Sequence, residues 1–416
     1  MRAELIAVGT ELLLGDVVDT NTAWLSSRLA EVGVDVHRHV TVGDNVERVA
    51  AALTEAADRA EVVLVTGGLG PTQDDLTRTA VALALGRPLR RRPELEAALR
   101  ERFAAAGRPM PASNLVQADL PEGARALAAV GTAPGVAVPL GAATVYCVPG
   151  VPSEMEEMVT RDVLGALVER GGAGVTRSRW VRTTGVGEAD VAEAVGPVVD
   201  RLDAAGNPTV AFLAGGGETR VRITAKAADR AGADALLAPV VDEVVALLGP
   251  VVVGVDEEAV EHAVARLLVA RGWTLAVAES ITGGGVGARL VRVPGASGWF
   301  RGGLIVYATP VKVTLAGVDA AIVDRHGPVS EEVAAALAAA ARERLGADVG
   351  LAVVGVAGPA LQDGQEIGTT WTSVALPDGP PSSSGAQLPG ASRERLQARA
   401  ATVALDRLRR TLATAP

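Results

Sequence analysis

The sequence predicts a multidomain protein of the α/β class, and three observations support this prediction. The chain has 416 residues, which is more than one ordinary hydrophobic core accommodates. Apolar residues make up 49% of the chain but aromatic residues only 2%, so its cores must consist of Ala, Val and Leu packed between helices and sheets. Apolar strand-like runs also alternate with helical patterns, which predicts parallel sheets covered on both faces.

Composition breaks divide the chain into three predicted domains, at residues 1–170, 171–254 and 255–416. In the first domain we expect strands at 5–8, 34–42, 62–66 and 143–148, and helices at 21–32, 45–60 with Asp44 as N-cap, 76–85 and up to about 169. A Gly-rich linker at 171–174 precedes a smaller α+β unit with strands at 180–184 and 219–227 and a helix at 190–204.

The third domain returns to the α/β pattern. We expect helices at 257–270, 330–345 and 393–412, a helix at 286–291 after the strand at 274–278, and further strands at 303–307, 349–356 and 369–376. Residues 377–390 are rich in Pro, Ser and Gly, which predicts a mobile loop before the closing helix.

Charge and cysteine content exclude several classes of function. The formal net charge is -10, with acidic and basic residues interspersed, so we expect neither a nucleic-acid partner nor a membrane partner. Cys147 is the single cysteine, which excludes an internal disulfide framework. The N-terminus runs directly into a strand pattern without a signal-like segment, and no unbroken apolar stretch is long enough for a bilayer. A cytoplasmic location is expected.

A glycine-rich loop follows the strand predicted at 62–66 and precedes a helical pattern. Glycines let backbone N–H groups approach an anion, and carboxylates beside a phosphate favour a divalent cation such as Mg²⁺. The predicted phosphate and metal ligands of this loop are Gly67, Gly68, Gly70, Thr72, Asp74 and Asp75. A tight turn with two helix-capping aspartates explains the same residues and stays open, because the loop matches neither a Walker motif nor a dinucleotide fingerprint.

A second candidate site contains a serine, a tyrosine and a lysine. Ser280 lies where a predicted strand gives way to a helix, a position from which a serine can act as a nucleophile beside N–H groups that accept an oxyanion. None of the four histidines lies in a triad motif, so Lys312, shortly after Tyr307, is the candidate base, with a pKa lowered by burial. A helix cap, a core aromatic residue and a solvated lysine are the alternatives for the three residues.

Motifs along nearly the whole chain resemble the CinA (competence/damage-inducible) family. In the N-terminal part they lie at residues 11–15, 19–21, 41–44, 66–75, 131–135 and 149–155. In the C-terminal part they lie at residues 278–284, 294–297, 307–312, 326–331 and 357–359. The order of the motifs along the chain matches that of the family.

This resemblance implies three domains: an N-terminal molybdopterin-binding-like α/β domain, a small α+β KH-type domain and a C-terminal α/β CinA-type domain. It implies that the C-terminal domain is a nicotinamide mononucleotide deamidase that needs no cofactor, and that the N-terminal domain is an ADP-ribose pyrophosphatase that needs a divalent metal. Small nucleotides are then the ligands, and a homodimer is expected.

The resemblance also assigns residue roles. Ser280 matches the nucleophile, and Tyr307 and Lys312 match a proton-handling pair. The implied ligands of the amidase substrate are Thr282, Gly283, Gly284, Gly358 and Arg393, and the implied metal ligands of the N-terminal domain are Asp44, Asp74 and Asp75.

The sequence departs from the family pattern at three places. Residues 308–310 read Ala-Thr-Pro where an Asn donor is usual, residues 360–366 replace a Gly-Gly and Lys-Pro segment, and an aspartate is missing before Arg393. A nucleotide- or pterin-binding regulatory protein with an inactive amidase domain is therefore the main alternative. A KH-type nucleic-acid adaptor is a second one, although residues 185–188 lack the GxxG clamp of such domains.

Overall fold

The computed structural model describes residues 1–171, 174–390 and 392–415, so that residues 172 and 173 of the predicted linker lie outside the described residues. The chain divides into two compact units, one of Met1–Arg177 with Lys226–Asp234 and one of Ser178–Ala225 with Ala235–Pro416. Within the described ranges, no helix is both long and apolar enough to cross a membrane.

The N-terminal domain is built on a mixed sheet in the order β2-β1-β3-β8-β7-β6. The strands β2, β1, β3 and β8 are parallel, whereas β7 and β6 are antiparallel additions at one edge. The bounds are β1 Arg2–Val8, β2 Asp35–Val42, β3 Val62–Thr66, β6 Arg125–Leu127, β7 Gly135–Leu140 and β8 Ala143–Val148, with a separate pair of β4 Leu89–Arg91 and β5 Asp119–Pro121. The predicted parallel sheet is thus confirmed for the four strands β2, β1, β3 and β8.

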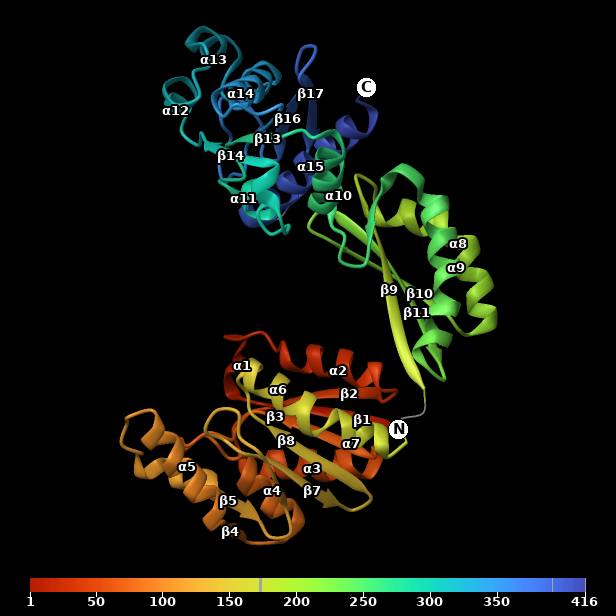
Figure 1. Cartoon of the computed structure of the whole chain (residues 1–416), viewed down its shortest axis with the longest axis vertical. Helices are drawn as coiled ribbons and strands as arrows, with labels where there is room; N and C mark the ends of the chain where they lie inside the picture. Colours follow the sequence, from red (N-terminus) through yellow and green to blue (C-terminus); the bar gives the residue numbers. More distant parts are fainter. Residues whose placement is uncertain (172–173, 391, 416) are drawn as a thin grey trace. The chain divides into compact units, whose positions relative to one another are not determined.

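Helices cover both faces of this sheet (Figure 1). One core lies between the sheet and α3 and α4, and a second between the sheet and α2, α6 and α7. The bounds are α1 Thr10–Leu14, α2 Asn21–Glu31, α3 Val46–Arg59, α4 Thr77–Leu85, α5 Pro93–Ala105, η1 Ala112–Ala118, α6 Pro152–Asp162 and α7 Leu164–Glu169. Cys147 lies in the first of these cores, where burial raises the pKa of its thiol to about 12.

One helix cap differs from the prediction. Asn45, and not Asp44, is the N-cap of α3, because its side chain accepts a hydrogen bond from the Arg48 N–H at 3.0 Å. The Asp44 carboxylate instead accepts from the N–H of Thr10, the first residue of α1, at 2.8 Å. The single helix predicted up to residue 169 is also interrupted, at Val163, between α6 and α7.

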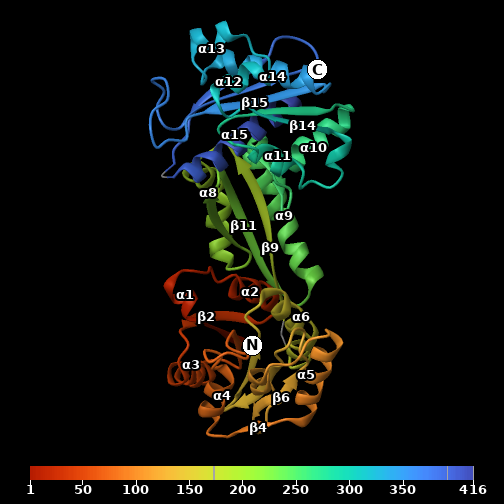
Figure 2. The same ribbon diagram turned by 90° about the vertical axis from the view of Figure 1, so that its left-hand side faces the viewer.

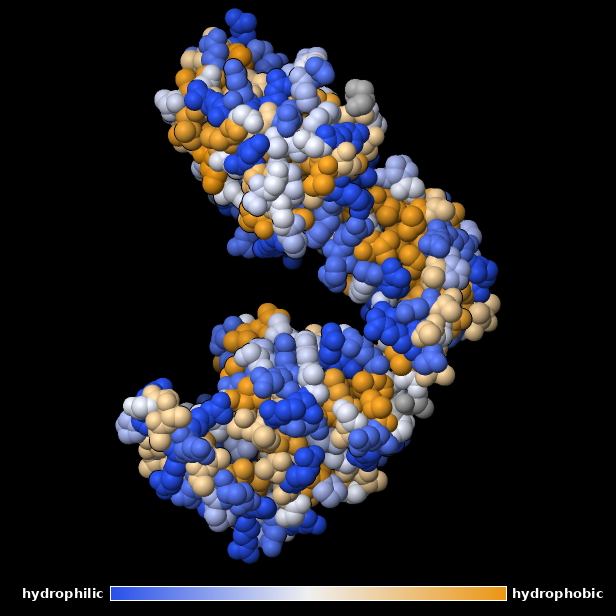
Figure 3. Space-filling view, in the orientation of Figure 1, coloured by the Kyte–Doolittle hydropathy of each residue, from blue (hydrophilic) through white to orange (hydrophobic). Residues whose placement is uncertain are grey.

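The middle domain consists of a sheet in the order β10-β11-β9-β12 with two long helices. The bounds are β9 Val175–Thr184, α8 Glu188–Ala205, β10 Thr209–Gly215, β11 Glu218–Ala227, α9 Arg230–Leu248, η2 Gly249–Val251 and β12 Val252–Val255. Its core is built largely of valine and leucine. Figure 3 shows apolar side chains gathered over part of this domain, among hydrophilic ones.

The C-terminal domain has a sheet in the order β14-β13-β15-β16-β17. The strands β14, β13 and β15 are parallel, and β13 and β15 are buried, while β16 and β17 are antiparallel. The bounds are β13 Leu275–Glu279, β14 Phe300–Ile305, β15 Val349–Gly355, β16 Thr369–Ala375 and β17 Ser382–Gln387. Residues 377–390, predicted as a mobile loop, therefore contain a strand that completes the sheet.

Helices again form a layer on each face of the sheet, as the two views in Figures 1 and 2 show. One core involves α10, α11 and α15, and the other involves α12, α13 and α14. The bounds are α10 Val260–Arg271, α11 Gly285–Leu290, η3 Ala296–Gly298, α12 Thr309–Thr314, α13 Ala320–His326, α14 Glu331–Arg344 and α15 Arg393–Thr414. This arrangement leaves the carboxyl end of β13 between the two layers, where ligands of α/β sheets usually bind.

Candidate functional site

Ser280 is the first residue after β13. Its backbone N–H donates to the Val353 carbonyl at 3.0 Å, which holds the residue at the end of the sheet, and its side chain is 6% exposed. Ser280 lines a pocket of about 440 Å³ together with residues of the turn after β15. A pocket of this volume falls within the range typical of small-molecule sites.

Lys312 approaches Ser280 from the helical layer that contains α12, α13 and α14. It lies on α12, whose neighbouring valines pack against the core beneath α14, and its side chain is only 1% exposed. Its Nζ lies 3.3 Å from the Ser280 Oγ, and it donates to the carbonyl oxygens of Val306 at 2.9 Å and Tyr307 at 3.4 Å. The expected burial of Lys312 is confirmed, and a solvated lysine is excluded.

The surroundings of Lys312 favour its neutral form. Burial lowers the pKa of its amine from its usual value to about 8, because a buried ammonium loses its hydration. A neutral amine has two N–H bonds and one lone pair. When the two carbonyls take the two N–H bonds, the lone pair is left for the hydroxyl of Ser280. The pair can therefore act as a nucleophile and its general base.

Tyr307 and Arg393 line the same pocket as Ser280. Tyr307 is 54% exposed, and its hydroxyl accepts a hydrogen bond from the Arg393 guanidinium, which also donates to the Gly358 carbonyl. Among the described residues, the Tyr307 hydroxyl has no hydrogen bond to Ser280 or Lys312. The structure thus brings Ser280 and Lys312 into direct contact, and it brings Tyr307, Gly358 and Arg393 together at the pocket wall.

Thr282, Gly283 and Gly284 are not among the residues that line the Ser280 pocket. The chain turns away from the pocket after Ile281, and the turn instead wraps around the buried carboxylate of Glu279. The three residues predicted to bind the substrate therefore lie outside the pocket that contains Ser280.

The sequence departures lie around this pocket without displacing the Ser280–Lys312 pair. Pro310 occupies the first turn of α12, where a proline needs no N–H partner, so the segment before Lys312 is a regular helix start. Ala360, Leu361 and Gln362 line the pocket, so the altered segment at 360–366 forms part of the surface that a substrate meets.

The glycine-rich loop after β3 forms a second pocket, of about 410 Å³, in the N-terminal domain. Gly67 has a φ of 100°, and a Cβ there would lie 2.2 Å from the Val8 carbonyl, so only glycine fits this close approach. Arg78, buried on α4, donates to the carbonyls of Leu69 at 2.6 Å and Gly70 at 2.7 Å. The buried guanidinium of Arg78 therefore holds the loop through its carbonyl oxygens and places a positive charge next to it.

The predicted metal ligands are partly engaged within the protein. Asp75 accepts from the N–H groups of Gly70 at 2.6 Å and Thr72 at 2.8 Å, and also from the Thr72 hydroxyl. A hydrogen bond from Thr72 also lowers the pKa of the exposed Asp74 carboxyl. Gly67, Gly68 and Gly70 line the pocket with Asp44, Asp74 and Asp75, but Thr72 does not.

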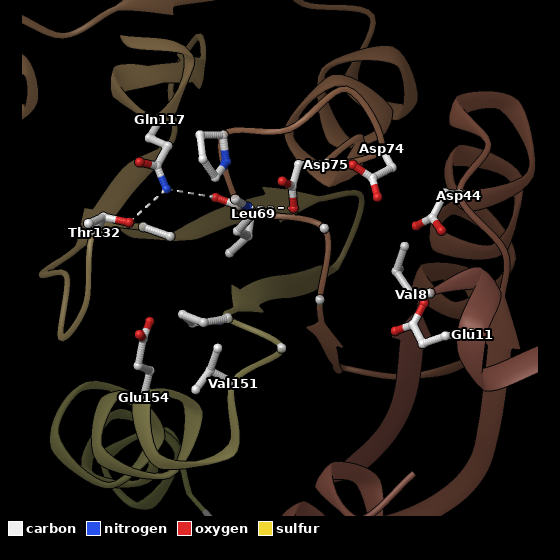
Figure 4. A pocket seen from close by; sticks show the side chains of 18 residues that line it. Val8, Glu11, Asp44, Leu69, Asp74, Asp75, Gln117, Thr132, Val151 and Glu154 are labelled. Carbon is white, nitrogen blue, oxygen red and sulfur yellow. Dashed lines mark hydrogen bonds between the residues drawn. The ribbon is translucent and has the colours of Figure 1, made fainter. Parts of the chain in front are cut away.

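The pocket lining also contains two glutamates to which the sequence analysis gave no role, Glu11 and Glu154. Figure 4 shows Glu11 on the same side as Asp44 and Asp74, and Glu154 on another side. Among the described residues, no three His, Cys, Asp or Glu side chains are grouped so as to hold a metal ion. Mg²⁺ usually takes one or two protein carboxylates and completes its shell with water and phosphate oxygens. The donor set therefore fits a cation shared with a phosphate-bearing ligand, with Asp74 and Glu11 as the candidate donors.

Sequence reasoning missed two charged residues that shape these sites. Arg78 stands in the apolar pattern of α4, and Glu279 ends the apolar run of β13. A charged residue within a buried pattern is the available signal, because such a residue is rarely buried without a partner. The partners themselves are turn amides and carbonyls, which the sequence pattern does not locate.

Comparison with known proteins gives consistent family matches along the chain. Family models match at residues 4–168 ("Probable molybdopterin binding domain"), 178–254 ("Damage-inducible protein CinA KH domain") and 257–412 ("CinA C-terminal domain"). A CinA-like protein of Frankia casuarinae is 51% identical over 423 residues, covering 100% of this chain and 97% of the relative. One of Parasynechococcus marenigrum is 43% identical, with 98% of each chain covered.

Among solved structures, the protein CinA "with unknown function" from Thermoplasma acidophilum is 34% identical. It covers 38% of this chain and 94% of its own, with a TM-score of 0.37.

The Ser280–Lys312 pair predicts a pH-dependent nucleophile. Labelling of Ser280 by a fluorophosphonate should accelerate as the pH rises through about 8, because Lys312 accepts the serine proton only when it is neutral. In Lys312→Arg the labelling rate should fall by roughly 10³-fold over the same pH range, since a guanidinium stays protonated. Mass spectrometry of the labelled peptide gives the rate, with Ser280→Ala as the blank. A wild-type labelling rate that does not change between about pH 6 and 9 would contradict this role.

Proposed function

This chain belongs to the CinA family, and we propose that its C-terminal domain is an amidohydrolase that converts nicotinamide mononucleotide to nicotinic acid mononucleotide and ammonia. The observation that carries the proposal is the contact of 3.3 Å between the Ser280 Oγ and the buried Lys312 amine. A serine with a neutral lysine base is suited to acyl transfer from an amide.

The proposed reaction has two steps. Lys312 takes the Ser280 proton as the Oγ attacks the carboxamide carbon, and the resulting ammonium then protonates the departing NH₂ group, which leaves as ammonia. Water, deprotonated by the same amine, attacks the acyl ester and releases the carboxylic acid and the free serine. No redox step occurs. The Ser280 proton leaves with the ammonia, and a proton of the water passes through Lys312 to restore the Ser280 hydroxyl and the neutral amine.

The pocket also has a group for the anionic end of such a substrate. Arg393 lies at the start of α15 and lines the pocket. Arginine binds phosphate with two parallel N–H bonds, so its guanidinium is the proposed phosphate ligand, with Tyr307 holding it in place. The polar carbonyl of Gly358 limits where that guanidinium points.

Replacement of Ser280 tests the proposed reaction directly. Ser280→Ala should lower ammonia release from nicotinamide mononucleotide by at least about 10³-fold, because no nucleophile remains. Ser297→Ala, an exposed serine of the same domain that does not line the pocket, is the matched control and should keep the wild-type rate. Equal rates in Ser280→Ala and wild type would overturn the amidase assignment. Calorimetric binding of nucleotide without product in wild type would favour a regulatory binding protein instead.

Removal of Arg393 should weaken substrate binding more than it slows chemistry. Arg393→Ala is expected to raise the KM for nicotinamide mononucleotide by roughly 10-fold to 100-fold, the loss typical of one charge-assisted contact, while kcat changes much less. Arg395→Ala removes an equal charge from an exposed position on the same helix and outside the pocket, and its KM should stay unchanged. Steady-state kinetics of the two variants decide the point. A KM for Arg393→Ala equal to that of Arg395→Ala would contradict the assignment.

For the N-terminal domain we propose hydrolysis of the diphosphate of ADP-ribose with the help of a divalent cation. The supporting observation is the combination of a glycine-rich loop backed by Arg78 with an acidic pocket lining. Carboxylates repel a diphosphate, and a divalent cation held by Asp74 and Glu11 would offset that repulsion and polarise the phosphoryl group. Asp75 keeps the loop in shape by accepting from its N–H groups, while Asp74 and Glu11 remain available to the cation.

Metal removal should abolish this second activity and leave the first one intact. Excess chelator is expected to stop the release of AMP and ribose phosphate from ADP-ribose, and added Mg²⁺ should restore it, whereas ammonia release from nicotinamide mononucleotide should continue. Asp75→Asn should reduce the metal-dependent rate because an amide NH₂ would face the loop N–H groups. Asp58→Asn, which is away from this pocket, is the control. Full hydrolysis in chelator would rule out the proposed role of the cation.

A further inference from the structure

Glu279 is a buried carboxylate directly before the nucleophile. It is the last residue of β13 and is 2% exposed. Side chains alternate along a strand, so Glu279 points to the same face as Val277, which packs in the core beneath α11 and α15. The residue therefore lies behind the turn that follows Ser280, on the side away from Lys312.

Both carboxylate oxygens of Glu279 accept hydrogen bonds from that turn. Oε2 accepts from the Thr282 hydroxyl at 2.7 Å and from the N–H groups of Gly284 and Val286 at 3.0 Å each. Oε1 accepts from the N–H of Gly287 at 2.8 Å. One carboxylate thus satisfies the free N–H groups in the first turn of α11, where a negative charge is also favoured by the helix dipole.

Together with two backbone bonds, these bonds engage every glycine N–H of the turn, so no glycine amide is left for a substrate phosphate. The two remaining glycine N–H groups of the turn are also engaged, since Gly283 donates to the Ser280 carbonyl at 3.1 Å and Gly285 to the Thr282 carbonyl at 2.9 Å. A glycine-rich turn before a helix commonly binds phosphate, but here the protein supplies its own anion. This engagement explains why Thr282, Gly283 and Gly284 lie outside the substrate pocket.

One amide beside the nucleophile remains open. Ile281 lines the Ser280 pocket, and its carbonyl accepts from the Gln397 side chain at 3.0 Å. Within residues 1–171, 174–390 and 392–415, its N–H has no hydrogen-bond partner. The N–H of Ser280 itself is taken by Val353. The N–H of the residue that follows a nucleophile is a common oxyanion donor in acyl transfer.

We propose that Glu279 is a positioning residue, which holds the turn after Ser280 so that the Ile281 N–H faces the pocket as the oxyanion donor. The inference rests on the proposed amidase function and deepens it. The carboxylate fixes the turn through Thr282 and α11, and Gln397 fixes the Ile281 carbonyl from the other side. The peptide next to the nucleophile is then held at both ends before the substrate arrives, as preorganised stabilisation of an oxyanion requires.

The test is Glu279→Gln, which keeps the volume but replaces one acceptor oxygen by an NH₂ group that faces N–H donors. We expect kcat for nicotinamide mononucleotide to fall about 10²-fold, as for loss of one oxyanion donor, while KM changes less than about threefold. Calorimetry in a Ser280→Ala background should give the same nucleotide affinity with and without Glu279→Gln, because the proposed substrate ligands lie elsewhere. The rising limb of the pH profile should stay near 8, because Lys312 is untouched.

The matched control is Asp348→Asn. Asp348 also holds a neighbouring strand end, because its carboxylate accepts from the Thr274 N–H at 2.8 Å and hydroxyl at 2.7 Å just before β13 begins, at the end opposite Ser280. Its replacement should lower the melting temperature but leave kcat and KM as they are. If Glu279→Gln does not fold, Thr282→Val removes one donor to the same carboxylate and should lower kcat at least about threefold without a change in KM.

Several outcomes would overturn the inference. The first is a kcat for Glu279→Gln that equals the kcat for Asp348→Asn. If Glu279→Gln does not fold, the same comparison is made with Thr282→Val. The second is a nucleotide affinity that falls in parallel with kcat, as expected for a general loss of structure. Fluorophosphonate labelling separates this inference from the proposed substrate. If wild type labels at Ser280 but releases no ammonia from nicotinamide mononucleotide, the proposed function fails, and slower labelling in Glu279→Gln still supports the positioning role. Absence of labelling in wild type overturns both.

Discussion

The chemistry of the C-terminal domain depends on keeping one amine away from water. Lys312 is buried between β13 and the helices of one layer, with carbonyl oxygens on two sides and the nucleophile on a third. An ammonium at this position loses hydration that the two carbonyls only partly replace, and this loss lowers its pKa to about 8. The packing of α12 against the sheet is therefore a condition for a usable base, and the position of the pocket follows from it.

Two glycine-rich turns at strand ends are stabilised in opposite ways. After β3, the buried cation Arg78 binds turn carbonyls, whereas after β13 the buried anion Glu279 binds turn amides. A turn held by its carbonyls keeps its amides on the pocket side, where Asp75 now meets them. After β13 the glycine amides are engaged within the turn, while the Ile281 N–H beside Ser280 has no partner among the described residues. Similar glycine-rich patterns thus border a pocket lined by carboxylates after β3 and support a nucleophile after β13.

Much of the architecture could be predicted from the sequence, because long apolar runs and helical periodicity report burial directly. The strands β3, β13 and β15 were found within one residue, and β1 was found with its start three residues too late. The strand β17 was missed, since its Ser-Ser-Ser-Gly-Ala-Gln sequence lacks strand-forming residues and pairs with β16 mainly through the backbone ladder. Asp44 and Asn45 are adjacent residues with equal capping ability, and only the backbone geometry distinguishes them. Ser280 and Lys312 were paired by family motifs, because contacts across 32 residues leave no local pattern.

Cys147 has a practical consequence for work on this chain. It is the single cysteine, lies fully within the core of the N-terminal domain, and keeps its thiol protonated at ordinary pH because its pKa is raised to about 12. Thiolates, and not thiols, react with maleimides and iodoacetamides, so the native protein has almost no background for such reagents. A cysteine introduced on any exposed surface would carry a spectroscopic label at one defined place. Distances measured between pairs of such labels would report the arrangement of the domains in solution.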